Sequence, residues 1–340
     1  MPEPVLQIDD LSISFALGGH DVDVVRGLSV EVEKGRTLAV VGESGSGKTI
    51  TGRSVMRLLP PAASAVGSIR LAGREMLTAG EKELRRIRGG DVAMVFQDSL
   101  SALSPYLSVG AQIVQAVRLH DPSVSRRAAL ARAVEMLDRV RIPEPADAAR
   151  RYPHEFSGGM RQRAVIAMAL VNRPALLIAD EPTTALDVTV QAQILALLRE
   201  LQDEYGMAML LISHDFGVVA SAADDVLVMY AGREAEYGSL RDIFEHPAHP
   251  YTAGLRAATP RLDAEGERAR LRAIPGAPTS LRDAGPGCAF APRCAFAPSL
   301  GGRCETELPL PTLRTASDED RIHRAACHLD RVPELQEAAR

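Results

Sequence analysis

The amino-terminal residues alternate between apolar and polar side chains in two stretches. The first covers residues 5–15 and the second residues 24–32, with residues 17–20 between them. Alternation with a period of two is typical of strands with one buried face, because successive side chains point to opposite faces of a sheet. The pattern therefore predicts two half-exposed antiparallel strands joined by a turn.

Short, almost wholly apolar runs follow, and several are separated by sequence with helical spacing. The apolar runs cover residues 37–41, 92–96, 175–179, 208–213 and 226–230. The helical spacing covers residues 48–59, 109–140, 164–171 and 190–204. Apolar strands that alternate with helices are typical of a parallel sheet covered on both faces. The sequence thus predicts an α/β fold whose middle part is mainly helical.

The composition is that of a globular protein of about two domains. The 340 residues are 46% hydrophobic and 24% charged, which excludes a disordered, collagenous or coiled-coil chain. From about residue 241 the sequence becomes rich in Pro, Arg and Ala. We therefore expect a main domain at residues 1–240 and an extension at residues 241–340 that has little core of its own.

The charge balance and the apolar runs limit the expected partners and location. The 39 Lys and Arg residues stand against 44 Asp and Glu, a formal charge of -5, so no global basic field favours nucleic acid. The amino terminus lacks the features of a secretory signal, and the apolar runs are shorter than the roughly 18 residues of a membrane span. We expect a reducing compartment, and a peripheral location if a membrane is involved.

Residues 42–49 match the pattern of a phosphate-binding loop between a strand and a helix. Backbone N–H groups of such a loop face phosphate oxygens, Lys48 neutralises the β- and γ-phosphates, and the Thr49 hydroxyl binds Mg²⁺. The alternative is a glycine-rich turn that caps a helix. The candidate nucleotide-binding residues are Gly42, Glu43, Ser44, Gly45, Ser46, Gly47, Lys48 and Thr49.

A second candidate anion site precedes the apolar helix at residues 164–171. Ser157 is well placed as a helix N-cap, and Gly158 and Gly159 leave N–H donors open to a γ-phosphate. An ordinary helix cap explains the same residues. The pattern is therefore compatible with a phosphate contact but does not require one.

Two adjacent carboxylates follow the apolar run at 175–179. Because neighbouring side chains of a strand point apart, Asp180 can hold Mg²⁺ through water while Glu181 polarises an attacking water. The alternative is a solvated acidic strand end. Gln97 and His214 follow two other runs, so that Gln97 can reach the metal or the water and His214 a γ-phosphate oxygen. Each of these two residues alone is more often an ordinary surface group.

These motifs in this order resemble the ATP-binding subunits of ABC transporters over residues 5–240. The resemblance implies a P-loop NTPase fold: a RecA-like core, an antiparallel β subdomain, a helical signature subdomain at about residues 98–165 and an irregular C-terminal extension. Residues 96–110, 156–170, 180–195 and 246–255 are similar to the oligopeptide/dipeptide importer branch, which includes nickel and glutathione importers. Met160 stands where the superfamily more often has Gln, and this branch often has Met.

The resemblance also implies roles for further residues. Phe15 would stack on adenine, although a core phenylalanine explains it nearly as well. Ser157 and Gly159 would complete the ATP site of a partner ATPase rather than their own, and Asp187, which closes the motif at residues 184–187, would belong to the nucleotide site. Residues 97–106 would help to form the groove for a coupling helix of the permease.

For the assembly, the resemblance implies a second and commonly different ATPase subunit, two permease subunits and an extracytoplasmic solute-binding protein. The chain would hydrolyse ATP to power peptide uptake at the cytoplasmic face of the membrane, with nickel, glutathione or another small solute as alternatives. Two other classes are a non-transport ABC ATPase that acts on DNA or ribosomes and a scaffold with a vestigial ATPase. The first needs coiled-coil inserts or two cassettes, and the intact Glu181 and His214 disfavour the second.

The four cysteines, Cys288, Cys294, Cys304 and Cys327, all lie in the extension. Five, nine and twenty-two residues separate them, which matches neither the usual zinc knuckles nor a ferredoxin. The segment is similar to the C-terminal region of peptide-importer ATPases, some of which bind a [4Fe-4S] cluster. We expect such a cluster in a structural role, with zinc or four unlinked thiols as alternatives.

Overall fold

The computed structural model describes residues 4–17, 20–97, 102–184, 186–259, 273–282, 284–318 and 321–333. The chain forms two compact units that alternate along the sequence. Unit 1 comprises Met1–Gln7, Glu31–Thr37 and Arg70–Ile212, and unit 2 comprises Ile8–Val30, Leu38–Ile69 and Ser213–Arg340. The division expected near residue 240 stays a prediction, which these compact units do not test.

Unit 1 contains a parallel sheet of three buried strands in the order β8-β7-β6. They are β6 (Val92–Val95), β7 (Leu176–Asp180) and β8 (Ala208–Ser213). Val92 pairs with Leu176, and Leu176 pairs with Ala208, so the three strands start in register. The parallel sheet inferred from the apolar runs is confirmed in this unit.

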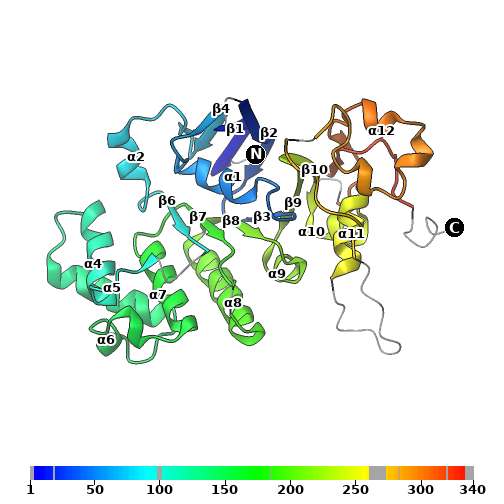
Figure 1. Ribbon diagram of the computed structural model, residues 1–340. Helices are drawn as coiled ribbons and strands as arrows, with labels where there is room; N and C mark the ends of the chain where they lie inside the picture. The colour runs from blue at the N-terminus through cyan, green and yellow to red at the C-terminus, as the bar shows by residue number, and fades with distance from the viewer. Residues whose placement is uncertain are drawn as a thin grey trace, which may run out of the picture. The chain divides into compact units, whose positions relative to one another are not determined.

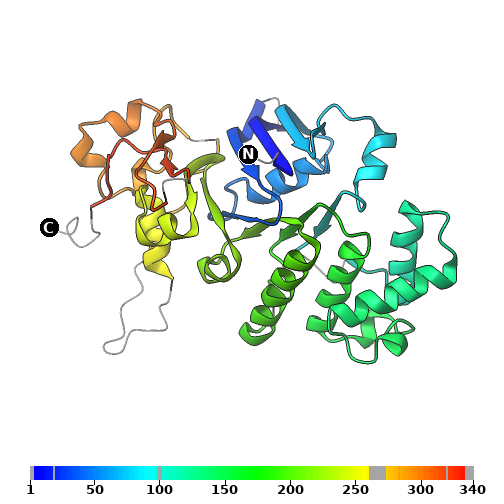
Figure 2. The same ribbon diagram turned by 180° about the vertical axis from the view of Figure 1, so that it is seen from behind.

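In unit 1, helix α5 contacts α4, α6 and α7 (Figure 1), and Figure 2 shows this group from behind. The bounds are α2 (Glu81–Ile87), α4 (Val109–His120), α5 (Arg126–Arg139), α6 (Pro145–Ala148), η1 (Pro153–Glu155), α7 (Gly158–Leu170) and α8 (Val188–Tyr205). The helical spacing of residues 109–140 is thus split between two helices. The break precedes Ser125, whose side chain caps α5 by accepting a hydrogen bond from the Ala128 N–H at 3.2 Å.

The alternating amino-terminal stretches form the strands expected, β1 (Leu6–Leu17) and β2 (His20–Val32). They are neighbours in a sheet that continues to β4 (Ala63–Leu71). Within unit 1, β5 (Arg74–Glu75) pairs antiparallel with Arg70 and Leu71. Helix α1 (Lys48–Val55) is shorter than the predicted helix, because Arg57 adopts a φ of 51°, outside the right-handed helical region.

The second sheet of unit 2 combines strands from both ends of the chain. Its order is β11-β12-β10-β9-β3, in which β3 pairs parallel to β9 and the other pairs are antiparallel. The bounds are β3 (Thr37–Val41), β9 (Asp225–Tyr230), β10 (Arg233–Ser239), β11 (Thr312–Leu313) and β12 (Arg324–Ala325). The C-terminal extension therefore completes one edge of this sheet.

The extension shares its core with the strands of unit 2. Ile243, Tyr251 and Phe290 are buried in one cluster with Phe216 and Tyr230. Each fully buried apolar side chain of this size contributes about 1.5–3 kcal/mol. The short elements around this cluster are α9 (Phe216–Ala222), α10 (Leu240–Glu245), α11 (Pro250–Ala258), η2 (Ala291–Arg293), η3 (Ala297–Leu300) and α12 (Arg303–Thr306).

Candidate functional site

The phosphate loop of unit 2 joins β3 to α1, as the sequence predicted. Gly42, Gly45 and Gly47 adopt φ values of 151°, 80° and 101°, in the region that favours glycine. A Cβ atom at Gly42 would lie 2.2 Å from the Met229 carbonyl oxygen, so only glycine fits there. Gly47 precedes α1 and provides no side-chain cap, and the N-terminus of a helix is suited to an anion.

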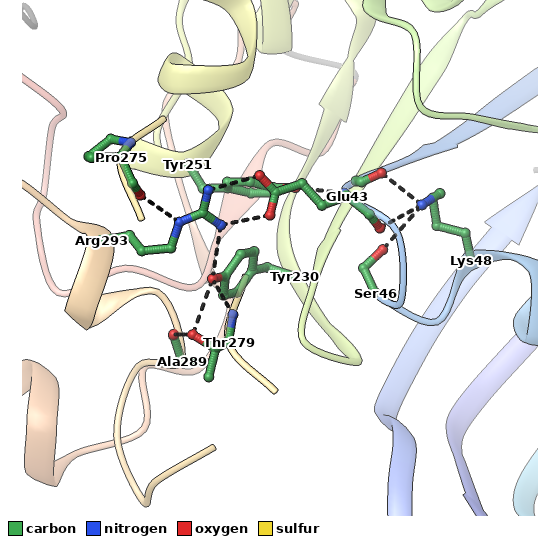
Figure 3. A network of polar contacts seen from close by, with 10 residues as sticks. Glu43, Ser46, Lys48, Tyr230, Tyr251, Pro275, Thr279, Ala289 and Arg293 are labelled. Atoms are coloured by element: carbon green, nitrogen blue, oxygen red, sulfur yellow. Dashed lines mark hydrogen bonds and ion pairs between the residues drawn. The ribbon is translucent and has the colours of Figure 1, made fainter. Parts of the chain in front are cut away.

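Lys48 lies buried along this loop (Figure 3). Its Nζ atom donates to the carbonyl oxygens of Gly42 at 2.7 Å and Glu43 at 2.8 Å. The ammonium is therefore held against the loop backbone, where it can neutralise a phosphate that binds to the loop N–H groups. Thr49 follows it in the first turn of α1.

In unit 1, Glu181 follows β7 and is held by two donors. Gln97 Nε2 donates to Glu181 Oε2 at 2.8 Å, and Thr184 Oγ1 donates to the same oxygen at 2.9 Å. The backbone of Glu181 has a φ of 49°, a strained value for a residue other than glycine and one found at functional sites. Asp180, the last residue of β7, is fully buried. The structure thus brings Gln97 to Glu181.

The role of Thr184 was missed by the sequence analysis, although the residue stands in a quoted motif. Its position three residues after Glu181, in a turn, was the available signal. This hydroxyl is a second donor beside the carboxylate and helps to orient it.

Ser157 caps α7 as predicted, because its Oγ accepts a hydrogen bond from the Met160 N–H at 3.3 Å. Ser157 and Gly158 are exposed. A Cβ atom at Gly159 would lie 3.0 Å from Cγ1 of Val190, so a glycine permits the close approach of α7 to α8. The start of α7 carries no acidic residue, which suits it to an anion.

The remaining predicted residues have simpler surroundings. Asp187 is the exposed N-cap of α8 and accepts from the Val190 N–H at 2.9 Å. Phe15 is half-buried in β1, and His214 is exposed directly after β8. Residues 98–101 of the expected coupling groove lie outside the described residues. Gln97, Ser157, Asp180, Glu181 and Asp187 belong to unit 1, whereas Phe15, the phosphate loop and His214 belong to unit 2.

The four cysteines are free, and Cys304 is buried while the others are half-buried. Burial, together with the nearby Cys304, Cys327 and Cys294, raises the pKa of Cys288 to about 11. Burial likewise raises the pKa of Cys327 to about 11, so both thiols are protonated at neutral pH without a metal. Across the described ranges, no three His, Cys, Asp or Glu side chains are placed to hold a metal ion. The [4Fe-4S] cluster expected from the sequence therefore stays a prediction.

His249 caps α11 inside the shared core. Its Nδ1 atom accepts from the Tyr251 N–H at 3.0 Å, and the Tyr251 hydroxyl accepts from the Glu43 N–H of the phosphate loop at 2.8 Å. Burial, helped by Arg314, lowers the pKa of His249 to about 4. The folded protein therefore keeps this imidazole neutral with Nδ1 as the acceptor.

This burial predicts an acid-sensitive fold. Between pH values of about 6.5 and 4 the unfolded chain binds a proton at His249 that the folded chain excludes, so stability falls as the pH falls. Each pH unit in this window costs up to about 1.4 kcal/mol. Denaturant unfolding at pH 7 and pH 5 should show a loss of about 2 kcal/mol that is smaller in His249→Asn, which keeps a capping side chain. An equal loss in both proteins would contradict the assignment.

No helix among the described residues is both long and apolar enough to cross a bilayer.

Two family models match the chain. Residues 25–184 match the ABC transporter family, and residues 235–299 match the oligopeptide/dipeptide transporter C-terminal region.

Characterised relatives match most of the chain. The dipeptide transport ATP-binding protein DppD of Bacillus subtilis is 49% identical over 93% of each chain. The oligopeptide transport ATP-binding protein OppD of Salmonella typhimurium is 49% identical over 91% of each chain. OppD of Mycobacterium tuberculosis is 50% identical over 95% of this chain but 52% of its own length, so the chain spans about half of that relative.

Solved structures match the same fold. A dimeric ATP-binding cassette, MJ0796, in a post-hydrolysis state with ADP and Pi has a TM-score of 0.62 at 25% identity and covers 69% of this chain and 99% of its own. The cbiO1 subunit of the cbiONQ ABC transporter complex of Clostridium perfringens has a TM-score of 0.61 at 25% identity and covers 71% and 91%.

The solved structures that the fold matches are ABC ATPase cassettes. The phosphate loop, the capped α7 and the carboxylates at the end of β7 agree with this class of protein. Within that class, the chain belongs to the ATP-binding subunits of the oligopeptide/dipeptide ABC transporters. The resemblance and the fold class inferred from the motifs are confirmed.

Proposed function

We propose that this chain hydrolyses ATP to power the import of dipeptides or oligopeptides, as a peripheral subunit on the cytoplasmic face of the membrane. One observation carries the proposal: the ABC region and the oligopeptide/dipeptide C-terminal region occur together in one chain, and this chain aligns with DppD of Bacillus subtilis over 93% of each chain. The phosphate loop with the buried Lys48 supplies the matching chemistry.

In this proposal the loop residues from Gly42 to Thr49 bind the ATP phosphates, with Lys48 as the cation. Thr49, Gln97 and Asp180 are the proposed Mg²⁺ ligands, and hydroxyl, amide and carboxylate oxygens suit this hard ion. Bound Mg²⁺ supplies positive charge that neutralises the phosphates. Phe15 stacks on the adenine.

Glu181 polarises the attacking water, and the donors Gln97 and Thr184 aim its carboxylate. His214 contacts a γ-phosphate oxygen. Ser157, Gly158 and Gly159 serve the nucleotide of a partner ATPase, to which the N–H groups at the start of α7 are suited. Asp187 belongs to the same nucleotide-binding set.

The proposed partners are a second, different ABC ATPase, two transmembrane permeases and an extracytoplasmic solute-binding protein, with no nucleic acid. ATP held between two ATPase subunits favours a closed pair, and its hydrolysis shifts the population to an open pair.

The experiment that tests the function is reconstitution of the complete complex in liposomes. ATPase activity and uptake of labelled dipeptides, oligopeptides, nickel and glutathione are measured with the solute-binding protein present. Peptide-dependent uptake that requires ATP supports the proposal. Uptake of nickel or glutathione alone would reject peptide as the solute, and a complex that neither binds nor hydrolyses ATP would reject the motor.

For the extension, we propose that Cys288, Cys294, Cys304 and Cys327 hold a structural [4Fe-4S] cluster. The support is the chemistry of four thiols in a single segment, where burial and neighbouring thiols raise the pKa of Cys288, Cys304 and Cys327. Ligation would require all four to be deprotonated and drawn together. Anaerobic protein should carry iron and sulfide with visible thiolate-to-iron absorption, and stoichiometric zinc or metal-free colourless protein would reject the cluster.

A further inference from the structure

Glu43 places a carboxylate inside a loop whose function is to bind an anion. The side chain is partly exposed, at 24% of its surface. A negative charge close to a triphosphate lowers the affinity of the site unless a cation neutralises it. The loop therefore requires a counter-ion for Glu43.

Arg293 of the C-terminal extension supplies this counter-ion (Figure 3). Its Nη1 and Nη2 atoms donate to the two carboxylate oxygens of Glu43 at 2.6 Å and 2.9 Å, across 250 positions in the sequence. Such a bidentate pair fixes the geometry as well as the charge. Only 5% of the Arg293 side chain is exposed, and the bond to Glu43 raises the pKa of its guanidinium.

Two further contacts hold the Arg293 side chain in place. Its Nε atom donates to the Pro275 carbonyl at 2.9 Å, and its Nη1 atom lies 3.2 Å from the Tyr230 hydroxyl. Tyr230 packs edge-on against Tyr251, with ring centroids 4.7 Å apart. The guanidinium is therefore pre-organised rather than free to follow the loop.

The backbone of Glu43 is held by Tyr251 of the C-terminal extension and by Lys48 of the loop. Its N–H donates to the Tyr251 hydroxyl, and its carbonyl oxygen accepts from Lys48 Nζ at 2.8 Å. Arg293 and Tyr251 of the extension thus contact Glu43, and Glu43 contacts Lys48. A displacement of the extension would therefore be transmitted to Lys48 through Glu43.

We propose that Arg293 is a positioning residue for the phosphate loop: it neutralises and orients Glu43, so that the C-terminal extension sets the affinity of the loop for ATP. The inference rests on the proposed function, because ATP is the ligand. A purely structural Arg293 would support folding but would not couple to the charge at position 43.

A double-mutant cycle on the full chain tests the proposal, with MANT-ATP and Mg²⁺ titrated by fluorescence. Arg293→Gln leaves the carboxylate unpaired and is expected to weaken MANT-ATP binding about tenfold, since a charge several ångströms away in a partly wet site repels by about that factor. Glu43→Gln leaves the Arg293 guanidinium unpaired and should tighten MANT-ATP binding. The double variant removes both charges and should recover most of the affinity that Arg293→Gln loses, because no carboxylate remains to repel the phosphates.

The matched control is Arg324→Gln. Arg324 also joins the extension to β10 through a bidentate pair, with Nε and Nη2 2.6 Å and 2.9 Å from the two oxygens of Glu234. The Arg324→Gln variant should bind MANT-ATP within about twofold of the wild-type affinity, while its stability should fall by an amount similar to that of Arg293→Gln. In the assembled transporter, Arg293→Gln should raise KM for ATP with kcat little changed. Arg293→Lys, which keeps the charge without the fork, should fall between wild type and Arg293→Gln.

Three results overturn the inference. The first is unchanged MANT-ATP binding in Arg293→Gln, and the second is a double variant as weak as Arg293→Gln. The third is equal weakening by Arg324→Gln, which would mark a general folding effect. If Arg293→Gln does not fold, the comparison of Arg293→Lys with and without Glu43→Gln decides by the same criterion. Failure of the wild-type chain and its assembled complex to bind ATP would instead reject the proposed function.

Discussion

Glu181→Gln is expected to bind ATP as tightly as wild type while its steady-state ATPase rate in the assembled complex falls by about 10³, within the range for a lost general base. The amide has the size of the carboxylate but accepts no proton from water. One amide oxygen still accepts from Gln97 and Thr184, so the local structure should persist. The rate is measured by phosphate release, and binding by equilibrium titration.

The control for this prediction is Glu204→Gln. Glu204 forms an exposed ion pair with Arg139 at 2.9 Å in the same unit, and its substitution removes the same charge. Its rate should stay within about twofold of wild type, since exposed pairs contribute little. Undiminished hydrolysis in Glu181→Gln would reject the assigned role of Glu181.

Lys48→Ala is expected to weaken ATP binding by about 100-fold, which corresponds to about 2.7 kcal/mol for a lost charge-assisted contact. The side chain contacts the carbonyl oxygens of Gly42 and Glu43, so its removal deletes the cation without removing a large apolar group. Lys34→Ala removes an equal charge from an exposed position and should have little effect. ATP affinity of Lys48→Ala close to wild type would exclude the loop as the phosphate site.

Features that depend on neighbouring residues were predictable. The phosphate loop needs only a strand, glycines with positive φ and a helix start within thirteen residues, from 37 to 49. The Ser157 cap likewise depends on an N–H three residues ahead. The alternation of apolar and polar residues in β1 and β2 indicates burial on one face, and this pattern can be seen in a short stretch of sequence.

Elements with weak local signals were missed. β11 and β12 have two residues each, and they are defined by pairing with distant strands: β12 pairs with β10, and β11 pairs with β12. The break before Ser125 was missed within the helical spacing of residues 109–140, although Pro122, which disfavours a continuing helix, was a local signal for it. The ligand set of the four cysteines stays a prediction, since spacing alone does not define a metal geometry.

The sequence by itself determined the class of protein, because the residues typical of phosphate binding are contiguous and the backbone geometry of such a motif depends on neighbouring residues. Only the tertiary structure decided which distant groups serve those motifs. Gln97 reaches Glu181 across 84 positions and Arg293 reaches Glu43 across 250. The physical reason is that ion pairs and side-chain hydrogen bonds act over a few ångströms in space, and a one-dimensional pattern carries no record of which residues folding brings that close.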